Sequence, residues 1–336
     1  MILIWIGSRA NYGRLYKLIE MLIAIGYEIG IIQGSYEIED FKENVVLKLD
    51  NDMRNDTPEN MVISSSIVAQ GVAHFIKSLK VKPRLAIVHA DRFENLGFAY
   101  AMSYVSIPLL HTEGGEDSGN IDDKIRDAIS ALADYHCVTT KDSEITLRTK
   151  SLNNVYFTGS PAIDYVKSLR LSRNENTIGD YYLVLYNPCP EDNMMLFVKA
   201  IEELAKIHKI IWVNPNVDPG SKDILKYIHK LNVEFVKNLR PHEYYKLLNG
   251  AKLLIGNTSS GIKEGAYLGV PYILVGNRQS NRETCSNVFL TDCDVDSIVK
   301  AVIDVKNCTI EYCGKFGVGN ASKNMVKVIE GIVNEN

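Results

Sequence analysis

Short runs of apolar residues alternate along the chain with longer segments in which apolar residues recur at helical spacing. In the first half, strands are expected at 2–6, 29–33, 85–89, 107–111, 137–140 and 155–159, and helices at 12–25, 59–79, 93–104, 122–133 and 143–150. Strands buried on both faces of a sheet read as continuous apolar runs, as residues 85–88 do. The alternation predicts an α/β protein whose parallel sheet is covered by helices on both faces.

The pattern breaks near residues 169–180, where Arg, Ser, Asn and Gly replace the apolar periodicity, and we interpret this stretch as a linker. A second series follows, with strands expected at 181–186, 210–214, 233–236, 253–256 and 272–275, and with helices ending near 207, beginning at 222, 242 and 260, and spanning 295–305 and 321–333. The sequence thus predicts two Rossmann-like parallel-sheet domains, 1–168 and 178–320, and a closing helix at 321–336. Two such domains are expected to face a central cleft, because doubly wound sheets bind ligands at the carboxyl ends of their strands.

Composition excludes several classes of protein. The 336 residues are 46% hydrophobic and 23% charged, which is typical of a folded globular protein. The formal net charge of −4 does not favour nucleic acid or an anionic membrane surface as a partner. No apolar run approaches the ~20 residues of a membrane span, and the apolar stretch 1–6 lacks the charged region that begins a signal peptide. We therefore expect a cytoplasmic protein.

Six cysteines are scattered along the chain without a CxxC pair. This spacing favours reduced thiols over a metal site or a disulfide framework. The carboxylate-rich segments also lack the spacing of a standard ligand set, so no metal is predicted.

Candidate chemistry gathers in segments that directly follow strands of the first half. Residues 7–13 form a glycine-bounded turn in which Arg9 can offer a bidentate fork to a phosphate, and a plain strand-to-helix turn is the alternative. Residues 89–94 place Asp91 and Arg92 at a strand end. The alternative there is an Asp91–Arg92 pair that caps the following helix.

The densest segment, 111–126, holds five carboxylates and three glycines between a strand and an amphipathic helix. Glycines allow the backbone to approach a ligand closely. Carboxylates supply acid–base chemistry, and crowding of like charges raises the pKa of some of them. Asp122 and Asp123 are also expected to cap the next helix.

Two segments of the second half suit a diphosphate. Residues 256–264 place small hydroxyl residues at a helix start, where backbone N–H groups and the helix dipole favour an anion, and Glu264 can accept from ribose hydroxyls. Residues 276–282 add Arg278 and Arg282, for which solvated surface arginines are the alternative. The G-x-G-x-x-G fingerprint and the Walker A pattern are both missing, so no dinucleotide cofactor is predicted. Anion-binding groups in one domain and carboxylates in the other suit a nucleotide-diphosphate sugar.

Several motifs stand in the order of a known family. They are Ser8-Arg9-Ala10-Asn11-Tyr12, Ala90-Asp91-Arg92-Phe93-Glu94, Glu113-Gly114-Gly115-Glu116, Ile121-Asp122-Asp123-Lys124-Ile125-Arg126, Gly159-Ser160-Pro161, residues 215–221, residues 257–264 and Gly276-Asn277-Arg278-Gln279. Over nearly the whole chain the sequence resembles the UDP-N-acetylglucosamine 2-epimerases, most closely the hydrolysing branch that includes bacterial sialic-acid enzymes. The resemblance implies a GT-B-like pair of Rossmann-type domains and a homo-oligomer, either a dimer or a tetramer.

The resemblance also implies a reaction. Members of the hydrolysing branch release UDP and N-acetylmannosamine from UDP-N-acetylglucosamine by loss of the C2 proton and the C1 diphosphate and addition of water on the other face, without a redox cofactor. By position, Asp91, Glu113 and Asp122 match the family's acid–base carboxylates, with Asp123 beside them. The residues that match nucleotide and diphosphate contacts are Arg9, Arg92, Ser259, Ser260, Glu264 and Arg278, and we add Glu116 from the same motifs and Arg282 from the segment 276–282.

Four positions depart from the family pattern. The chain has Asn187 and Asp127 where the family usually has histidines, Ala90 in place of Gly, and Asn11 in place of Asp. We retain Asn187 as a catalytic candidate, although an amide can donate a hydrogen bond but cannot deliver a proton at neutral pH.

The sequence therefore predicts a hydrolysing UDP-N-acetylglucosamine 2-epimerase that serves sialic-acid-like or surface-polysaccharide sugar synthesis. The alternatives are a GT-B-type glycosyltransferase, a 2-epimerase for a different nucleotide sugar, and a nucleotide-sugar-binding protein with a degenerate catalytic site.

Overall fold

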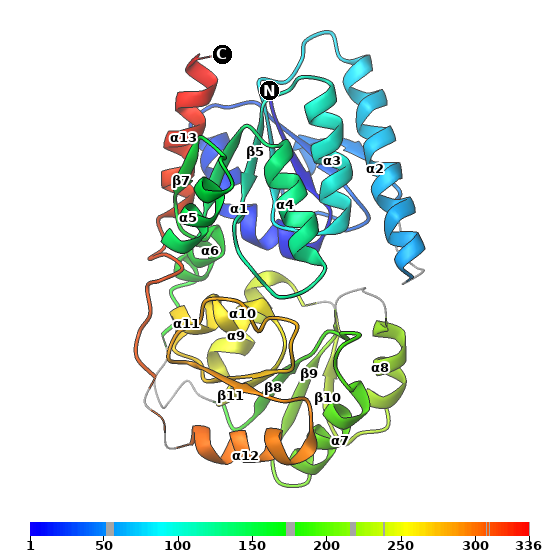
Figure 1. Cartoon of the computed structure of the whole chain (residues 1–336), viewed down its shortest axis with the longest axis vertical. Coiled ribbons are helices and arrows are strands. Elements are labelled where there is room, and N and C mark those ends of the chain that lie inside the picture. The colour runs from blue at the N-terminus through cyan, green and yellow to red at the C-terminus, as the bar shows by residue number, and fades with distance from the viewer. Residues whose placement is uncertain are drawn as a thin grey trace. The chain divides into compact units, whose positions relative to one another are not determined.

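The computed structural model describes residues 1–51, 57–172, 179–215, 220–237, 239–306, 308 and 310–335. The chain forms two compact units, each built on a parallel sheet with helices packed against it (Figure 1). Unit 1 contains Met1–Asp117, Ile121–Tyr165 and Phe316–Asn336, and unit 2 contains Ser118–Asn120 and Val166–Lys315.

The seven-stranded sheet of unit 1 has the order β3-β2-β1-β4-β5-β6-β7, and its strands pair in parallel. The strands are β1 Ile2–Ile6, β2 Ile29–Gln33, β3 Val45–Lys48, β4 Leu85–His89, β5 Leu109–Thr112, β6 Tyr135–Val138 and β7 Val155–Phe157. The strand order reverses between β1 and β4. Loops at such a switch point diverge to opposite faces and leave room for a ligand, so the segments after β1 and β4 are where Arg9 and Asp91 belong.

Helices cover both faces of this sheet because β1 is apolar on both sides. Ile2, Ile4 and Ile6 pack with α1 (Arg9–Ala24) and α13 (Ala321–Glu335), whereas Leu3 and Trp5 pack with α2 (Pro58–Ser78) and α3 (Phe93–Tyr104). The remaining helices of the chain's first half are η1 Lys42–Asn44, α4 Asp122–Leu132, α5 Lys141–Thr149 and α6 Pro161–Ser168.

The six-stranded sheet of unit 2 has the order β10-β9-β8-β11-β12-β13, again parallel, with the reversal between β8 and β11. The strands are β8 Tyr182–Leu185, β9 Ile210–Val213, β10 Glu234–Val236, β11 Leu253–Gly256, β12 Tyr272–Val275 and β13 Val288–Thr291. The helices are α7 Met194–Ala205, α8 Ser221–Ile228, α9 Pro241–Gly250, α10 Ser259–Ile262, α11 Glu264–Leu268 and α12 Val295–Val305. Because β8 and β11 are paired in parallel, the segments that follow these two strands lie at the same edge of the sheet.

The α/β fold class and the two Rossmann-like sheets are confirmed. The structure adds β3, β13 and α6, which span only four, four and eight residues. It also assigns residues 166–168 to unit 2 and 316–320 to unit 1, unlike the boundaries expected from sequence, because Phe316 and α13 are buried in unit 1. The expected boundary at 178, half of the linker (173–178) and residues 216–219 of the 215–221 motif lie outside the described residues.

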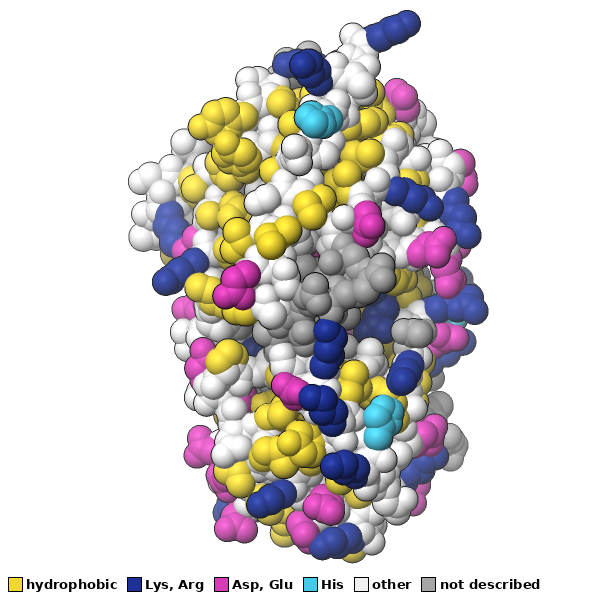
Figure 2. Space-filling model, turned by 90° about the vertical axis from the view of Figure 1, so that its right-hand side faces the viewer, with side chains coloured by type: hydrophobic (Ala, Val, Ile, Leu, Met, Phe, Trp, Pro, Cys, Tyr) yellow, Lys and Arg dark blue, Asp and Glu magenta, His cyan; other side chains and the backbone are white. Residues whose placement is uncertain are grey.

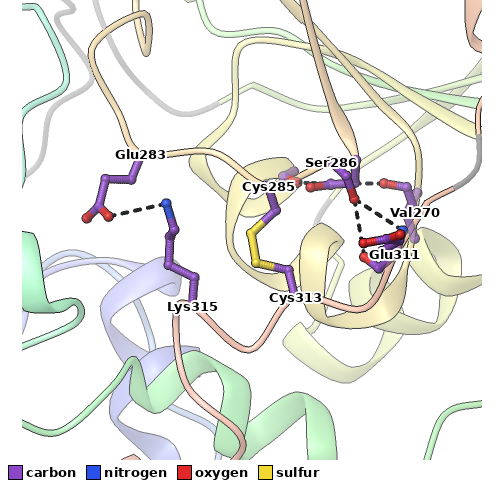
Figure 3. The surroundings of a disulfide bond; sticks show 9 residues. Val270, Glu283, Cys285, Ser286, Glu311, Cys313 and Lys315 are labelled. Atoms are coloured by element: carbon purple, nitrogen blue, oxygen red, sulfur yellow. Dashed lines mark hydrogen bonds and ion pairs between the residues drawn. A yellow bond between two sulfur atoms is a disulfide. The ribbon is translucent and has the colours of Figure 1, made fainter.

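The expectation that all cysteines are reduced thiols is wrong for one pair. Cys285 and Cys313 form a disulfide, with 6.2 Å between their Cα atoms and 28 positions between them in sequence (Figure 3). Cysteines this far apart in sequence form no local motif, so the pairing becomes visible only in the folded structure. Cys137, Cys189, Cys293 and Cys308 remain thiols.

In the part of the chain that the structure describes, the histidines, cysteines and carboxylates form no group suited to hold a metal ion. Among the described helices, none combines the length and the apolar character needed to cross a bilayer.

Candidate functional site

The turn between β1 and α1 is fastened to the end of β4. The Ser8 hydroxyl caps α1 by accepting from the Asn11 backbone N–H at 3.2 Å, and the Asn11 side-chain amide donates to the His89 carbonyl at 3.3 Å. Arg9, half-buried, is the first residue of α1. The amide at position 11, where the family usually has a carboxylate, thus connects the segments that carry Arg9 and Asp91.

A buried arginine, Arg126, binds the carboxylates of two neighbouring loops. Its guanidinium, 1% exposed, pairs with Asp91 after β4 and with Asp123 one turn earlier on α4. It also donates to the Glu116 carbonyl at 2.6 Å. Burial alone would lower the pKa of Arg126, but the charges of Asp91 and Asp123 outweigh it and the pKa is raised. Arg126 therefore stays charged and fixes the loops after β4 and β5 relative to each other.

Asp122 and Asp123 do not cap α4 as expected. The N-cap residue is Ile121, which makes no side-chain capping hydrogen bond, and both aspartates lie in the first turn of the helix. Carboxylates are still favourable there because the helix dipole is positive at its N-terminus. Asp122 follows Ile121 directly, so it lies at the same loop–helix junction as Asp123.

Arg92 was expected to contact the nucleotide or its diphosphate. In the structure, its guanidinium donates to the Glu94 carboxylate at 2.9 Å.

Glu113 lies in a second buried cluster at the end of β5. Its Oε1 accepts from the Ser160 hydroxyl at 2.6 Å, and its Oε2 lies 3.4 Å from Arg14 Nη1 and 3.7 Å from His89 Nε2. These partners come from α1, from β4 and from the residue before α6. These contacts fix the orientation of the Glu113 carboxylate, and the residue is only 2% exposed.

Two backbone positions beside these carboxylates are left-handed. Ala90 has φ +61° and Glu113 has φ +63°, a region that residues with a Cβ rarely adopt. The family's usual glycine before the aspartate is explained by this conformation at position 90. Strained backbone of this kind concentrates at functional sites.

His111 holds the Ala90 backbone in place. Its Nε2 donates to the Ala90 carbonyl at 3.1 Å, and its Nδ1 accepts from the Ser130 hydroxyl at 3.0 Å. Burial, followed by the nearby His136, lowers the pKa of His111 to about 3, and burial lowers the pKa of His136 to about 4. Both rings are thus neutral near pH 7, and His111 acts as a fixed hydrogen-bonding bridge.

Sequence reasoning gave no role to His111, Arg14 or Ser160. A signal existed for two of them, because His111 begins the 111–126 segment and Ser160 stands in the Gly-Ser-Pro motif. Arg14 lies one residue beyond the first glycine-bounded segment, and its partner Glu113 is 99 positions away. Only the fold reveals that pairing.

In unit 2, the Asn257 side chain joins the segments that follow β8 and β11. Its Oδ1 accepts from the Asn187 backbone N–H at 2.8 Å, and its Nδ2 donates to the Asn187 carbonyl at 2.7 Å. Gly256 allows this approach, since a Cβ at this position would come within 1.9 Å of the Leu185 carbonyl oxygen. Asn187 is thereby held at the switch point of this sheet.

The helix expected from residue 260 is interrupted. Thr258 caps the four-residue α10 by accepting from the Ser260 backbone N–H at 3.3 Å, and α11 begins at Glu264. The dipole of so short a helix is small, so anion binding here would depend on hydroxyl and N–H donors. The Ser260 hydroxyl bonds to that of Tyr244, and buried Glu264 accepts from the Tyr245 hydroxyl at 3.0 Å.

Arg278 and Arg282 occupy the loop after β12. Arg278 Nη1 donates to the Asn257 carbonyl at 3.1 Å, which places it beside Ser259 and the end of β11. Arg282 bonds through Nε to the Gln279 side chain. Within unit 2, Arg278 therefore joins the group formed by Asn187, Ser259, Ser260 and Glu264, whereas the Arg282 side chain is directed to its own loop.

Comparisons with known proteins agree with this architecture. Structures of a Methanocaldococcus jannaschii UDP-GlcNAc 2-epimerase in complex with UDP-GlcNAc and UDP and of a Neisseria meningitidis UDP-GlcNAc 2-epimerase bound to UDP-GlcNAc superpose with TM-scores of 0.85 and 0.82. They are 19% and 18% identical to this chain, and each match covers 98% of this chain and 99% of theirs. At these identities they establish the fold.

Sequence relatives span nearly the same length. A Legionella pneumophila UDP-N,N'-diacetylbacillosamine 2-epimerase (hydrolyzing) is 26% identical over 97% of this chain and 94% of its own. A Neisseria meningitidis UDP-N-acetylglucosamine 2-epimerase is 29% identical over 88% and 85%. The family model described as UDP-N-acetylglucosamine 2-epimerase matches residues 35–330. With most of its length covered by that match, the chain belongs to the UDP-N-acetylglucosamine 2-epimerase family.

Proposed function

We propose that this protein is a hydrolysing 2-epimerase that converts UDP-N-acetylglucosamine and water to N-acetylmannosamine and UDP. The observation that carries the proposal is the pair of buried carboxylate clusters at the ends of β4 and β5, with Arg126 bound to Asp91 and Asp123 and with Ser160 and Arg14 on Glu113. Relatives named as hydrolyzing enzymes from Legionella pneumophila and Campylobacter jejuni support the same reaction class.

The reaction consists of two steps that need oriented acids and bases. In the first, a carboxylate removes the C2 proton while the C1–oxygen bond breaks, so that UDP leaves and an unsaturated sugar remains. In the second, water adds its hydroxyl to C1, and C2 receives a proton on the opposite face. We assign Asp91, Glu113 and Asp122 to these proton transfers, and Asp123 to the positioning of Arg126. Such groups contribute about 10²–10⁴-fold each when they are correctly placed.

Departure of UDP requires stabilisation of the diphosphate. We assign Ser259, Ser260, Arg278 and Arg282 to the diphosphate, Glu264 to the ribose hydroxyls, and Arg9, Arg92 and Glu116 to further contacts with the bound nucleotide sugar. Asn187 would donate a hydrogen bond to the leaving group. A guanidinium and several hydroxyl donors can stabilise the charge that develops on UDP without a proton transfer. We propose no cofactor, because every step is a proton transfer, an elimination or a hydration.

A second candidate substrate is UDP-N,N'-diacetylbacillosamine. It is supported by the Legionella relative, which is named for that sugar and matches 97% of this chain. The reaction would be the same, since only the sugar substituents remote from C1 and C2 differ.

The test is incubation of the purified protein with each nucleotide sugar in D₂O. Phosphorus NMR measures release of UDP, and proton NMR identifies the 2-epimer and deuterium at C2. We expect free UDP and a free 2-epimer labelled at C2, with Asp91→Asn lowering the rate at least about 100-fold. A labelled UDP-linked epimer without free UDP would contradict hydrolysis, and no product from either sugar would contradict the proposed function.

We further propose that the protein acts in the cytoplasm as a homo-oligomer whose contact surface includes α2 and α3. Val62 is 68% exposed and Tyr104 is 76% exposed, and Ile63 and Tyr100 are exposed beside them. Figure 2 shows hydrophobic side chains gathered over this side of unit 1. Exposed apolar side chains gathered on two packed helices are typical of an interface. Light scattering after size exclusion should give a dimer or tetramer mass, and Val62→Asp with Tyr104→Asp should give a monomer.

A further inference from the structure

The Cys285–Cys313 disulfide joins two segments that are far apart along the chain. Cys285 ends the loop after β12, residues 276–287, and Cys313 lies in the segment 310–315 that follows α12. Both cysteines are half-buried, so small thiols can reach them. Figure 3 shows two further contacts beside the disulfide: Lys315 Nζ lies 3.5 Å from the Glu283 carboxylate, and the Glu311 backbone N–H donates to Ser286 Oγ at 3.1 Å.

The disulfide is the strongest of these links. The Glu283–Lys315 pair is partly solvated, and ion pairs at such positions contribute little. Ser286 and Glu311 are exposed, so water competes for their hydrogen bond. The attachment of the loop to segment 310–315 therefore depends mainly on whether the two sulfur atoms are bonded.

The same loop carries the arginine assigned to the diphosphate. Within residues 276–287 the backbone forms only bends and turns, with Gly276 at φ +71°. At its start, the Asn277 backbone N–H donates to Asp192 at 3.2 Å, and Arg278 reaches the Asn257 carbonyl. Toward the other end, Cys285 ties the loop to segment 310–315 seven residues after Arg278, shortly before Asn287, whose buried amide donates to the Gly261 and Val270 carbonyls. Loss of the disulfide would loosen the stretch between Arg278 and Asn287.

We propose that Cys285 and Cys313 form a redox-controlled latch that sets the affinity of unit 2 for a nucleoside diphosphate. The inference rests on the proposed function for the identity of that ligand. The oxidant is a small disulfide such as glutathione disulfide. One cysteine thiolate attacks it and releases a glutathione thiolate, which takes up a proton. The second thiolate then attacks the mixed disulfide and releases a second glutathione. Two protein thiols are oxidised, and one glutathione disulfide is reduced to two glutathione molecules.

The redox state is measured first. Alkylation of the denatured protein followed by intact mass should show four labels after treatment with glutathione disulfide and six after treatment with dithiothreitol. Hydrogen exchange of peptides that cover 276–287 should be faster in the reduced protein. Six labels under oxidising conditions, or equal exchange in the two states, would overturn the latch whether or not the protein is an epimerase.

Calorimetric titration with UDP then tests the effect on the ligand. We expect reduction to weaken UDP binding at least about fivefold in the wild-type protein. The double variant Cys285→Ser, Cys313→Ser should bind UDP weakly under both conditions, and the control Cys308→Ser, which removes an exposed thiol near the same segment, should respond as wild type does. Equal UDP affinity in the oxidised and reduced wild-type protein would overturn the latch and leave the proposed function intact. No UDP binding in either state would overturn both.

Discussion

At the scale of single residues, Arg126 has the most demanding surroundings. It is buried and satisfies two carboxylates and a backbone carbonyl at once, which the planar, five-donor guanidinium can do and a lysine ammonium cannot. Asp91, which we propose as a catalytic carboxylate, therefore depends on a residue that need not touch the substrate.

Arg126→Lys tests this dependence while it keeps the charge. We expect kcat to fall about 10- to 100-fold with a smaller change in KM, because a displaced Asp91 affects the chemical step more than binding. The pH profile of kcat should also shift, since the carboxylate loses hydrogen-bond donors. The exposed Arg148→Lys serves as control. An unchanged kcat and pH profile in Arg126→Lys would rule out a positioning role.

The buried histidines predict how stability depends on pH. The folded-state pKa values of His111 and His136, about 3 and about 4, lie below the unfolded value near 6.5, so the unfolded chain binds more protons as the pH falls. Their contribution to stability is complete above pH 6.5 and is lost below it. Between pH 6.5 and 5 each should remove about 2 kcal/mol from the free energy of unfolding.

Urea unfolding at pH 7, 6 and 5 measures this slope. The variant His136→Asn should reduce the pH dependence by about half, whereas the exposed His229→Asn is the matched control. A free energy of unfolding that stays constant from pH 7 to 5 would show that the two rings are not held neutral.

The left-handed backbone at Ala90 predicts a stabilising substitution. A left-handed residue with a Cβ costs about 1–2 kcal/mol, of which the greater chain entropy of unfolded glycine offsets roughly half. We expect Ala90→Gly to raise the free energy of unfolding by about 0.5–1 kcal/mol. Ala99→Gly, in the middle of α3, should lower it by about 1 kcal/mol or more. A loss of stability in Ala90→Gly would contradict the strain.

At the scale of elements, the sequence predicted the long pieces and their order, and it missed what depends on contacts across the fold. Leu85–His89 follows the expected pattern because it is buried on both faces and reads as a continuous apolar run, and Phe93–Tyr104 because its buried residues recur along the helix. Strand β13 lacks that signal, since its side chains are only partly buried. The clusters around Glu113 and Arg126 join residues up to 99 positions apart, which periodicity cannot reveal. Asp91 and Glu113 could be singled out because they follow strands, whereas the pairing of Glu113 with Arg14 could not be predicted.

The Cys285–Cys313 disulfide covalently joins the loop between β12 and β13 to the segment 310–315. A cross-link that closes 28 positions restricts the unfolded chain and is worth about 3–4 kcal/mol. Reduction should therefore lower the unfolding midpoint of unit 2, which the fluorescence of Trp212 reports in a Trp5→Phe background. The same treatment of the Cys285→Ser, Cys313→Ser variant is the control. If dithiothreitol does not lower the unfolding midpoint reported by Trp212 in the Trp5→Phe protein that keeps both cysteines, this contribution of the disulfide is contradicted.

At the scale of the whole molecule, unit 1 is completed by the last helix of the chain. Ile329 and Met325 of α13 are fully buried among residues of α1 and β1. Ile329→Ala should destabilise unit 1 by about 2–5 kcal/mol and shift the unfolding transition seen by Trp5 in a Trp212→Phe background. The exposed Ile303→Ala on α12 is the control. A Trp5 transition unaffected by Ile329→Ala would contradict this packing.

The position of α13 also has a consequence for biosynthesis. A ribosome releases the chain from its N-terminus, so the sheet of unit 1 emerges first and its last helix emerges only after all of unit 2. During that interval the apolar face of α1 that α13 covers is open to solvent and to other nascent chains. Unit 2, by contrast, has nearly all its residues in one continuous stretch, 166–315, and can fold as it emerges. The nascent protein should therefore complete its second unit before its first, and chaperones that bind exposed apolar helices should associate with it until α13 has emerged.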